Sequence, residues 1–295
     1  MSYQSIFRPG LFTDQVIVVT GGGTGIGRCT AHELASLGAK VIIAARTEET
    51  LIDTAAEIHE AGGDCDHVKL DLRDEGSIER AGTEIVSRHG RIDGLFNNAG
   101  GQFVSPVENM SANAWRAVID LNLNGTFLMS KAVMEHSMKE NGGAIVNMLA
   151  DIWTGFPGMA HMAAARAGID NLAKTMSVEW APYNIRVNCV APGTILSSGM
   201  LTYPREVQEF TVSNMAKQPS ARLGTESEVS AAVTFLLSPA STYIRGETIR
   251  VDGGEAFQKD RLIPIGQHSG TDRFEGFHLQ ADYSETPFDV MLRKK

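Results

Sequence analysis

Short apolar segments alternate with longer amphipathic segments along most of the chain, from about Val16 to Val251. The apolar segments contain few polar positions, which is typical of parallel strands covered by helices on both faces. We expect seven strands, at residues 16–20, 40–45, 67–70, 92–96, 144–148, 186–190 and 248–251. Helices are expected at residues 25–37, 48–60, 75–89, 112–140, 160–180 and 226–237. This alternation predicts an α/β fold: a Rossmann-type, doubly wound parallel sheet of seven strands in a single domain, residues 1–254.

Two segments depart from the alternation. Residues 194–223 have Gly, Ser and Pro near their start and only a weak helical pattern, so we predict a lid after the sixth strand. Residues 255–295 are polar and irregular, with several aromatic residues. We predict that this C-terminal extension, or tail, packs on the same domain or on a neighbouring subunit.

The segment TGGGTGIG at residues 20–27 joins the first predicted strand to the first predicted helix. Glycine lets backbone N–H groups approach a diphosphate at the positive end of a helix. Glycines can also serve a tight turn alone, but the strand before, the helix after and a second strand about twenty residues on favour a dinucleotide site. We expect the cofactor to contact Gly21, Gly23, Thr24, Gly25, Ile26 and Gly27.

The residue after the second strand indicates which dinucleotide binds. Proteins that bind NAD usually place an acid there, and its charge would repel a 2′-phosphate. This chain has Ala45 followed by Arg46, and a guanidinium binds a phosphate well. We therefore predict NADP(H) as the cofactor. The alternative is that Arg46 is a surface residue paired with Glu48 or Glu49.

The next two strands end at the same edge of the sheet. Asp71, which precedes Leu72, is placed to accept a hydrogen bond from the adenine amino group; the alternative is a cap for the helix that begins near Glu75. The segment NNAG at residues 97–100 has small residues against which the cofactor's ribose can lie. We expect cofactor contacts at Asp71, Leu72, Asn98, Ala99 and Gly100.

These motifs resemble the short-chain dehydrogenase/reductase family over residues 11–257. The matching segments are TGGGTGIG at 20–27, NNAG at 97–100, Asn122 within 121–123, VAPG at 190–193 and VDGG at 251–254. The resemblance implies that Asn122 holds a structural water in a proton relay. It also implies that the segment after Pro192 and Gly193 contacts the nicotinamide through Thr194, Ile195 and Ser197.

The family's catalytic signature is missing. The family has Tyr-x-x-x-Lys on the helix after the fifth strand and a Ser about a dozen residues earlier, whereas this chain has Met162-Ala-Ala-Ala-Arg166, with Leu149 or Ala150 near the Ser position. Met162 has no exchangeable proton. Arg166 keeps its charge, so it can anchor the ribose or lower the local potential without relaying protons. Alcohol dehydrogenation by the tyrosine route is therefore not expected.

Reduction of an activated C=C bond does not require the tyrosine. Hydride adds to the β-carbon, charge develops on a carbonyl oxygen, and hydrogen-bond donors stabilise the enolate. Within the family, residues 97–106, 155–157, 164–168 and 188–193 are similar to peroxisomal-type trans-2-enoyl-CoA reductases. That branch also carries the arginine, although it has a small hydroxyl residue in place of Met162. The resemblance implies an NADPH-dependent reductase of enoyl thioesters with apolar acyl chains.

Several residues are candidates for the missing roles, each with a simpler alternative. Asp151 is placed to donate or accept a proton, or to cap a loop. His161 is a candidate acid, or a helix cap. Gln102 could hydrogen-bond a substrate carbonyl, or lie in solvent. Apolar side chains that could line a substrate pocket, or simply pack in the core, are Trp153, Phe156, Met159 and Met200.

Two other functions stay open. One is a dehydrogenase or reductase of apolar alcohols and aldehydes, such as terpenoid ones, with Asp151 or His161 in place of the tyrosine. The other is a catalytically weak NADP(H)-binding subunit or sensor, because the cofactor motif is intact while the catalytic signature is dismantled.

Composition and charge limit the partners and the cellular compartment that we expect for this protein. A formal net charge of −9 argues against binding to nucleic acid or to an anionic membrane surface. The three cysteines have no metal-ligand spacing, so we expect reduced thiols, no metal and a cytoplasmic protein. No apolar run is long enough for a leader or a membrane span. The helices at residues 112–140 and 160–180 are the expected contacts of a homotetramer or homodimer.

Overall fold

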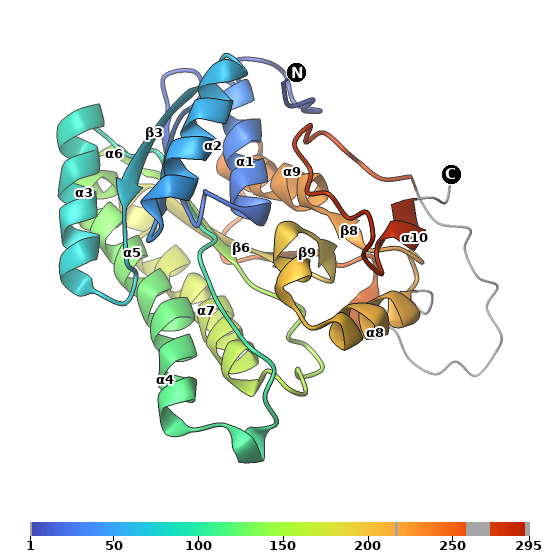
Figure 1. Cartoon of the computed structure of the whole chain (residues 1–295). Coiled ribbons are helices and arrows are strands. Elements are labelled where there is room, and N and C mark those ends of the chain that lie inside the picture. The colour runs from blue at the N-terminus through green and yellow to red at the C-terminus, as the bar shows by residue number, and fades with distance from the viewer. Residues whose placement is uncertain (1, 216–217, 258–271, 293–295) are drawn as a thin grey trace.

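The computed structural model describes residues 2–215, 218–257 and 272–292. Seven of its strands form one parallel sheet in the order β3-β2-β1-β4-β5-β6-β9 (Figure 1). These strands are β1 (Val16–Thr20), β2 (Lys40–Ala45), β3 (Asp64–Lys69), β4 (Gly94–Asn97), β5 (Gly143–Met148), β6 (Ile185–Pro192) and β9 (Thr248–Val251). The order runs outward from β1 in one direction and from β4 in the other. This confirms the predicted Rossmann-type fold, in which ligands bind outside the carboxyl ends of the strands where the order reverses.

The strand β1, inside the sheet, explains why the sheet needs two layers of helices. Every residue of β1 is buried. Val18 lies opposite Ile42 of β2 and Leu95 of β4, so the centre of the sheet is apolar along both neighbours. A strand that is apolar on both faces is stable only when both faces are covered.

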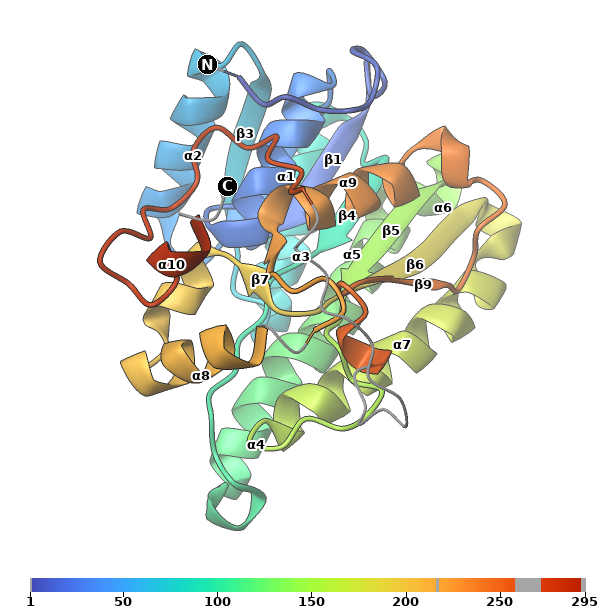
Figure 2. The same ribbon diagram turned by 90° about the vertical axis from the view of Figure 1, so that its right-hand side faces the viewer.

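Helices cover both faces (Figures 1 and 2). On one face, α1 (Gly25–Ser36), α2 (Glu48–Glu60) and α9 (Glu226–Leu237) contribute to one apolar cluster. On the other face, α3 (Glu75–His89), α5 (Gly125–Val133) and α7 (Ala160–Glu179) contribute to a second. The remaining helices are α4 (Ala112–Ile119), α6 (Lys139–Asn141), α8 (Arg205–Met215) and α10 (Asp289–Leu292).

Two strands start two or three residues away from their predicted first residue. β3 starts at Asp64 instead of residue 67, because an edge strand can expose polar side chains such as Asp64 and Lys69. β4 starts at Gly94 instead of residue 92. The Ile92 N–H donates to Ser137 Oγ at 2.7 Å, outside the sheet.

The helix predicted at residues 112–140 is continuous in direction but not uniform. Two π-helical turns, Asp120–Asn124 and Met134–Met138, separate α4 from α5 and α5 from α6. A π turn contains more residues than an α turn and often occurs at functional sites. The first of them carries Asn122, whose side chain is fully buried.

The segment predicted as a lid contains ordered elements. The short strand β7 (Ile195–Leu196) pairs with β8 (Gly224–Thr225), and α8 lies between them in the sequence. Leu196 and Leu223 pack with Tyr283 and Phe288 of the tail in one apolar cluster. Met200, Leu201, Val212 and Met215 pack against this cluster.

The described part of the tail, residues 272–292, packs on the domain itself. Phe277 lies in a small cluster with Tyr3 and Cys29 of α1, and the Gln4 N–H donates to the Gly276 carbonyl at 2.9 Å. Figure 2 shows the tail running past α1, α9 and α8. Within the described residues, no helix has the length and apolar character needed to cross a membrane.

Candidate active site

The glycine-rich loop between β1 and α1 forms a cradle for an anion. Gly21 and Gly25 have φ values of +65° and +55°, which favour glycine. A Cβ atom added to Gly27 would overlap the Gly21 carbonyl oxygen and lie 2.5 Å from Asn98 Nδ2. At these glycines no side chain lies between the backbone and a ligand at the start of α1, where N–H groups and the helix dipole attract a phosphate. This geometry fits the diphosphate of a dinucleotide.

The end of β4 is tied to this cradle. Asn98 Nδ2 donates to the carbonyls of Thr20 and Gly21 at 3.1 and 3.2 Å. Thr20 Oγ1 accepts from the N–H groups of Asn98 and Ala99 at 3.0 and 3.1 Å. Asn98 therefore fixes the cradle to the end of β4. Ala99 and Gly100 come after Asn98 in the chain, and Gly100 is exposed. The exposed Thr24 makes no cap hydrogen bond with its side chain, and the partly buried Ile26, in the first turn of α1, packs against the apolar cluster on this face.

A cleft of about 410 Å³ lies beside the carboxyl ends of β2 and β3 and the start of α3. It is lined by Arg46, Lys69, Asp71, Ser77, Arg80, Ala81 and Glu84. Arg46 is exposed, and in the described parts of the chain it makes no ion pair with Glu48, Glu49 or any other acid. Its guanidinium is thus available to an anion that enters the cleft.

Asp71 is held differently from the helix cap considered above. Asp74 caps α3 by accepting from the Gly76 N–H at 2.9 Å, so the cap interpretation of Asp71 is wrong. Asp71 pairs with Arg73, with Oδ2 and Nη2 2.9 Å apart, and this hydrogen-bonded cation lowers the pKa of Asp71. The next residue, Leu72, is buried, and a Cβ on Gly125 of α5 would lie 2.8 Å from its Cβ.

Arg166 and Asn122 converge on Gly100. A Cβ on Gly100 would overlap Arg166 Nη2 and lie 2.5 Å from Asn122 Oδ1. Arg166 is 5% exposed and donates from Nη1 to the Met148 carbonyl at 2.5 Å. Burial lowers the pKa of Arg166 to about 10, so it stays charged at neutral pH. Asn122 holds the Gly101 backbone, with Nδ2 donating to its carbonyl at 2.8 Å and Oδ1 accepting from its N–H at 3.2 Å.

The segment after β6 approaches the same crevice. Gly193 follows Pro192, the last residue of β6, and donates its N–H to the Val251 carbonyl at 3.0 Å. Glu255 accepts from the Thr194 N–H at 2.9 Å and from its hydroxyl at 3.1 Å. The Thr194 hydroxyl oxygen can therefore still accept a hydrogen bond from a ligand. Ile195 lies in β7, and Ser197 precedes the 3-10 helix Ser198–Thr202.

Two carboxylates lie near the end of β5 and the end of β9. Asp151 Oδ1 and Asp252 Oδ2 are both buried without a hydrogen-bond partner in the described residues. Burial raises the pKa of Asp151, and repulsion from Asp252 acts in the same direction, while the Trp153 N–H and Arg250 oppose it. A buried carboxyl oxygen without a donor favours the protonated form. Asp151 is thus a carboxyl group that these surroundings move toward its neutral form, which makes it a candidate acid.

Arg250 of β9 lies close enough to Asp151 for its charge to act on that carboxyl group. Its guanidinium carbon lies 4.0 Å from the ring centre of Trp153 and 5.2 Å from that of Phe257. The cation is held by aromatic faces and is not neutralised by a carboxylate at contact distance in the described residues.

His161 and Gln102 take up separate positions. His161 is fully buried, packs edge-to-face on Phe103 with ring centres 4.5 Å apart, and has a pKa lowered by burial. Its Nδ1 accepts from the Met162 N–H at 2.7 Å, and its Nε2 makes no hydrogen bond in the described residues. Gln102 Nε2 donates to the hydroxyl of Tyr203, before α8, at 3.1 Å. In the parts described, no hydrogen bond joins His161 to Asp151.

Residues 21–255 match the family model described as Enoyl-(Acyl carrier protein) reductase. The chain belongs to the short-chain dehydrogenase/reductase family. A probable 2,4-dienoyl-CoA reductase of Bacillus subtilis is 38% identical over 244 residues, 82% of this chain and 96% of the relative. A peroxisomal 2,4-dienoyl-CoA reductase of Danio rerio is 37% identical over 273 residues, 89% of this chain and 90% of the relative.

Solved structures of this short-chain dehydrogenase/reductase fold are also similar. A citronellol catabolism dehydrogenase of Pseudomonas aeruginosa is 46% identical with a TM-score of 0.78, covering 86% of this chain and all of its own, 100%. A short chain dehydrogenase of Bacillus anthracis is 36% identical with a TM-score of 0.75, covering 85% of this chain and 99% of its own.

In this short-chain dehydrogenase/reductase, Met162 and Arg166 occupy the positions at which the tyrosine and lysine were expected. Met162 is buried at 4% exposure and offers no proton, and Asp151, on which the charge of Asp252 acts, stays a candidate acid. Asp252 lies inside the VDGG segment, so its position at the sheet edge could have been inferred from the motif. Glu255 and Arg250 carried no such signal. Among the predicted pocket residues, Trp153 and Phe156 are exposed, whereas Met200 packs in the cluster between lid and tail.

Replacing Gly27 with Ala tests the cradle. The added methyl group would overlap the Gly21 carbonyl oxygen, so the loop must open and its N–H groups turn away from the diphosphate. We expect NADPH affinity, measured by fluorescence titration, to fall by about 100-fold or more. Gly76→Ala is the control, because the nearest atom there is 3.1 Å away at the flexible end of Arg80. Unchanged affinity in Gly27→Ala would contradict the cradle assignment.

Proposed function

We propose that the protein is an NADPH-dependent reductase of the C=C bond of an α,β-unsaturated thioester, a 2-enoyl-CoA or a 2,4-dienoyl-CoA. The observation that carries this proposal is an intact dinucleotide cradle beside a site in which Met162 and Arg166 stand in place of the tyrosine and lysine. The similarity to 2,4-dienoyl-CoA reductases at 37–38% identity supports the same reaction class.

The proposed cofactor lies along the carboxyl edge of the sheet. The glycine loop would hold its diphosphate, Arg46 a 2′-phosphate, and Asp71 with Leu72 the adenine. Asn98, Ala99 and Gly100 would border a ribose, with Pro192, Gly193, Thr194, Ile195 and Ser197 beside the nicotinamide. When bound, the reduced nicotinamide supplies a hydride.

Arg166 and Asn122 act on this site without exchanging protons. Arg166 keeps its charge when buried, and its contact with Gly100 places that charge at the edge of the ribose region. Asn122 fixes the backbone of Gly101, so the loop after β4 keeps its distance from Arg166. Together they set a positive potential that favours an electron-rich enolate over a neutral thioester.

Asp151 and His161 complete the chemistry in this proposal. As hydride reaches the unsaturated carbon chain, negative charge moves to the thioester carbonyl oxygen, and a buried N–H is a suitable partner for it. In this proposal the oxygen accepts a hydrogen bond from Nε2 of His161, which has no other partner in the described residues. Asp151 then gives its proton to the α-carbon of the enolate and regains one from solvent.

The apolar mouth suits an acyl chain. Phe103, Val104, Trp153 and Phe156 are 37–53% exposed on the loops after β4 and β5. Exposed apolar side chains gathered in this way favour an apolar ligand or an interface. An unsaturated acyl chain that lies on them would reach the carboxyl edge of the sheet with its thioester end.

A second candidate is supported by the solved structure of highest identity reported above. Similarity at 46% identity to a citronellol catabolism dehydrogenase favours a dehydrogenase of apolar alcohols, with Asp151 as the base. In that case Asp151 must be ionised, whereas burial favours its protonated form.

We also propose that the protein is a cytoplasmic homotetramer or homodimer. Trp115 of α4, Phe127 of α5 and Val178 of α7 are 40%, 41% and 75% exposed, on the helices expected to meet a second copy. The three cysteines are free and buried, which suits a reducing compartment.

The first experiment measures NADPH consumption with 2-enoyl-CoAs and 2,4-dienoyl-CoAs of short, medium and branched chains, beside oxidation of apolar alcohols with NADP⁺. We expect turnover of the thioesters and none of the alcohols. Turnover of the alcohols alone would replace the main proposal with the second candidate. NADPH binding without turnover of either would support a non-catalytic subunit or sensor.

Arg46→Asp tests the choice of cofactor. Loss of the guanidinium and the new charge should raise the Kd for NADPH about 10- to 100-fold and leave that for NADH nearly unchanged. Arg80→Asp is the matched control, since Arg80 lines the same cleft but pairs with Asp74 at 3.4 Å. An equal loss for both dinucleotides, or an equal loss in the control, would refute the 2′-phosphate assignment.

Asp151→Asn tests the proton donor. We expect kcat to fall about 10²- to 10⁴-fold. In the wild-type protein kcat should fall as pH rises through the raised pKa of Asp151, because only the protonated acid donates, and the Asn variant should lose this dependence. Asp252→Asn removes a repelling charge, so the decline should begin at a lower pH. His161→Gln should lower kcat without changing the pH at which kcat declines. If Asp151→Asn keeps the wild-type decline, Asp151 is excluded as the acid.

A further inference from the structure

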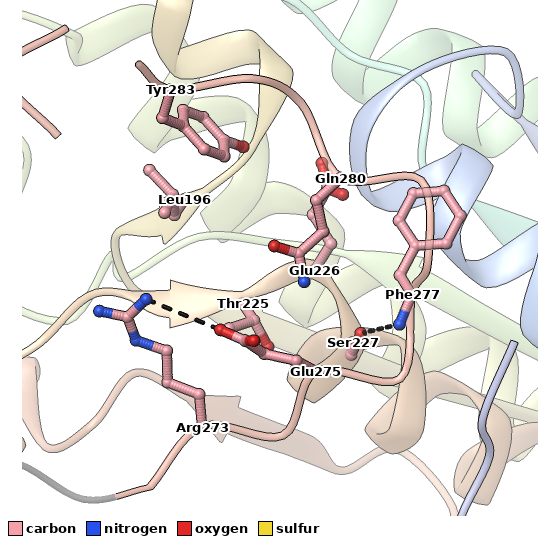
Figure 3. A pocket seen from close by; sticks show the side chains of 9 residues that line it. All are labelled: Leu196, Thr225, Glu226, Ser227, Arg273, Glu275, Phe277, Gln280 and Tyr283. Carbon is pink, nitrogen blue, oxygen red and sulfur yellow. Dashed lines mark hydrogen bonds and ion pairs between the residues drawn. The ribbon is translucent and has the colours of Figure 1, made fainter. Parts of the chain in front are cut away.

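A second buried acid lies where α9 meets the cofactor cradle. Glu226, the first residue of α9, is 7% exposed. It lines a small pocket closed by the tail, together with Ser227 beside it, Leu196 of β7 and Tyr283 of the tail (Figure 3). No role in the proposed reaction uses this carboxyl group.

The Glu226 carboxyl reaches the start of α1. A Cβ atom added to Gly25, the first residue of α1, would lie 3.8 Å from Glu226 Oε1 and 3.7 Å from Ser198 Oγ. The Ser198 backbone N–H lowers the pKa of Glu226, against the larger effect of burial. Gly25 belongs to the cradle for the diphosphate, so Glu226 and a bound diphosphate would be neighbours.

Charged groups from two elements surround Glu226, and none forms an ion pair with it in the described residues. From α1, the charge of Arg28 lowers the pKa of Glu226, but Arg28 donates to both Glu57 carboxyl oxygens at 2.7 Å. Cys29, also on α1, has a pKa that burial and Glu226 raise. From the tail, Arg273 pairs with Glu275 at 3.7 Å, and Tyr283 has a pKa that burial and Glu226 raise.

Burial raises the pKa of Glu226 to about 7, so both of its forms are populated near neutral pH. The two forms differ in their effect on a neighbouring diphosphate. The ionised form repels it, whereas the protonated form offers an O–H donor to a diphosphate oxygen.

We propose that Glu226 binds the diphosphate of the dinucleotide as a neutral hydrogen-bond donor, so that cofactor binding takes up one proton from solvent. This inference depends on the dinucleotide site alone and is independent of the substrate proposed above. It makes cofactor affinity fall as pH rises through the neutral range.

The tail supplies the burial on which this coupling depends. The Phe277 N–H donates to Ser227 Oγ at 3.0 Å, and Thr225 Oγ1 donates to the Phe274 carbonyl at 2.7 Å. These bonds hold the tail across the first turn of α9, with Phe277 and Gln280 over the pocket (Figure 3). Glu226 is thereby kept from water, which is the cause of its raised pKa.

The test measures the Kd of NADPH by fluorescence titration between pH 7 and pH 8. With a free-protein pKa of about 7, the Kd should rise about fivefold. The 2′-phosphate titrates near pH 6, and its ionisation works in the opposite direction, so it cannot produce this rise. NADH, which has no 2′-phosphate, should show the same rise. Calorimetry in buffers of different ionisation enthalpy should give an uptake of about half a proton at pH 7 and nearly one at pH 8.

Glu226→Gln keeps the size and the donor but cannot ionise. Its Kd should stay at the low-pH value throughout, with no proton uptake. Glu275→Gln is the control, because this carboxyl group lines the same pocket but pairs with Arg273, and it should retain the wild-type dependence. A constant wild-type Kd without proton uptake would overturn the proposal, as would a dependence that persists in Glu226→Gln.

The stability of the ligand-free protein gives an independent reading. A buried acid with a raised pKa stabilises the fold only while it is protonated, and this contribution is lost as pH rises through the folded-state value. The Tm of Glu226→Gln should therefore rise relative to the Tm of the wild-type protein as the pH is raised from 5 to 8. Equal pH profiles of Tm would mean that Glu226 is not a neutral acid in the free protein. Failure of all dinucleotides to bind at any pH would instead refute the cofactor assignment.

Discussion

The hydrogen bonds between Asn98 and the end of β1 hold the two halves of the site together. The chain reverses its winding direction between β1 and β4, and that reversal opens a crevice for a ligand. An opening between two strands needs something to fix its width. Asn98 does so by bonding to Thr20 and Gly21, while the Thr20 hydroxyl accepts the two N–H groups that follow β4. The cradle and Gly100 take their positions from this link, and so do the side chains of Arg166 and Asn122 that converge on Gly100.

Burial, more than ion pairing, sets the charges around that crevice. Arg166 stays positive because even a lowered pKa lies far above neutral, whereas Asp151 and Glu226 are moved toward the neutral acid. These three groups lie at different points along the proposed cofactor and substrate path. The site we propose therefore combines a fixed positive charge with two exchangeable protons, without the tyrosine expected from its family.

The sequence was a good guide where backbone geometry or uninterrupted apolarity decides the structure. The backbone is left-handed at Gly21 and Gly25, and there is no room for a side chain at Gly27. The glycine loop could therefore be recognised from its amino-acid sequence. The same is true of β1, which is apolar throughout. β3 was placed less well because an edge strand tolerates Asp64 and Lys69. Glu226, Glu255 and Arg250 could not be found in this way, since their surroundings come from the tail, the segment after β6 and the loop after β5, which only the folded chain brings together.

The π turn at residues 120–124 also has an evolutionary consequence. A helix rotates by about 100° per residue, so a lineage that gained or lost a single residue within this helix would swing everything on one side of the change around the axis. Asn122 would then lose its hydrogen bonds to Gly101, even if every other residue were unchanged. Selection on this stretch therefore acts on its length as much as on its composition, and a one-residue gap here in a distant relative would mark a rebuilt active site.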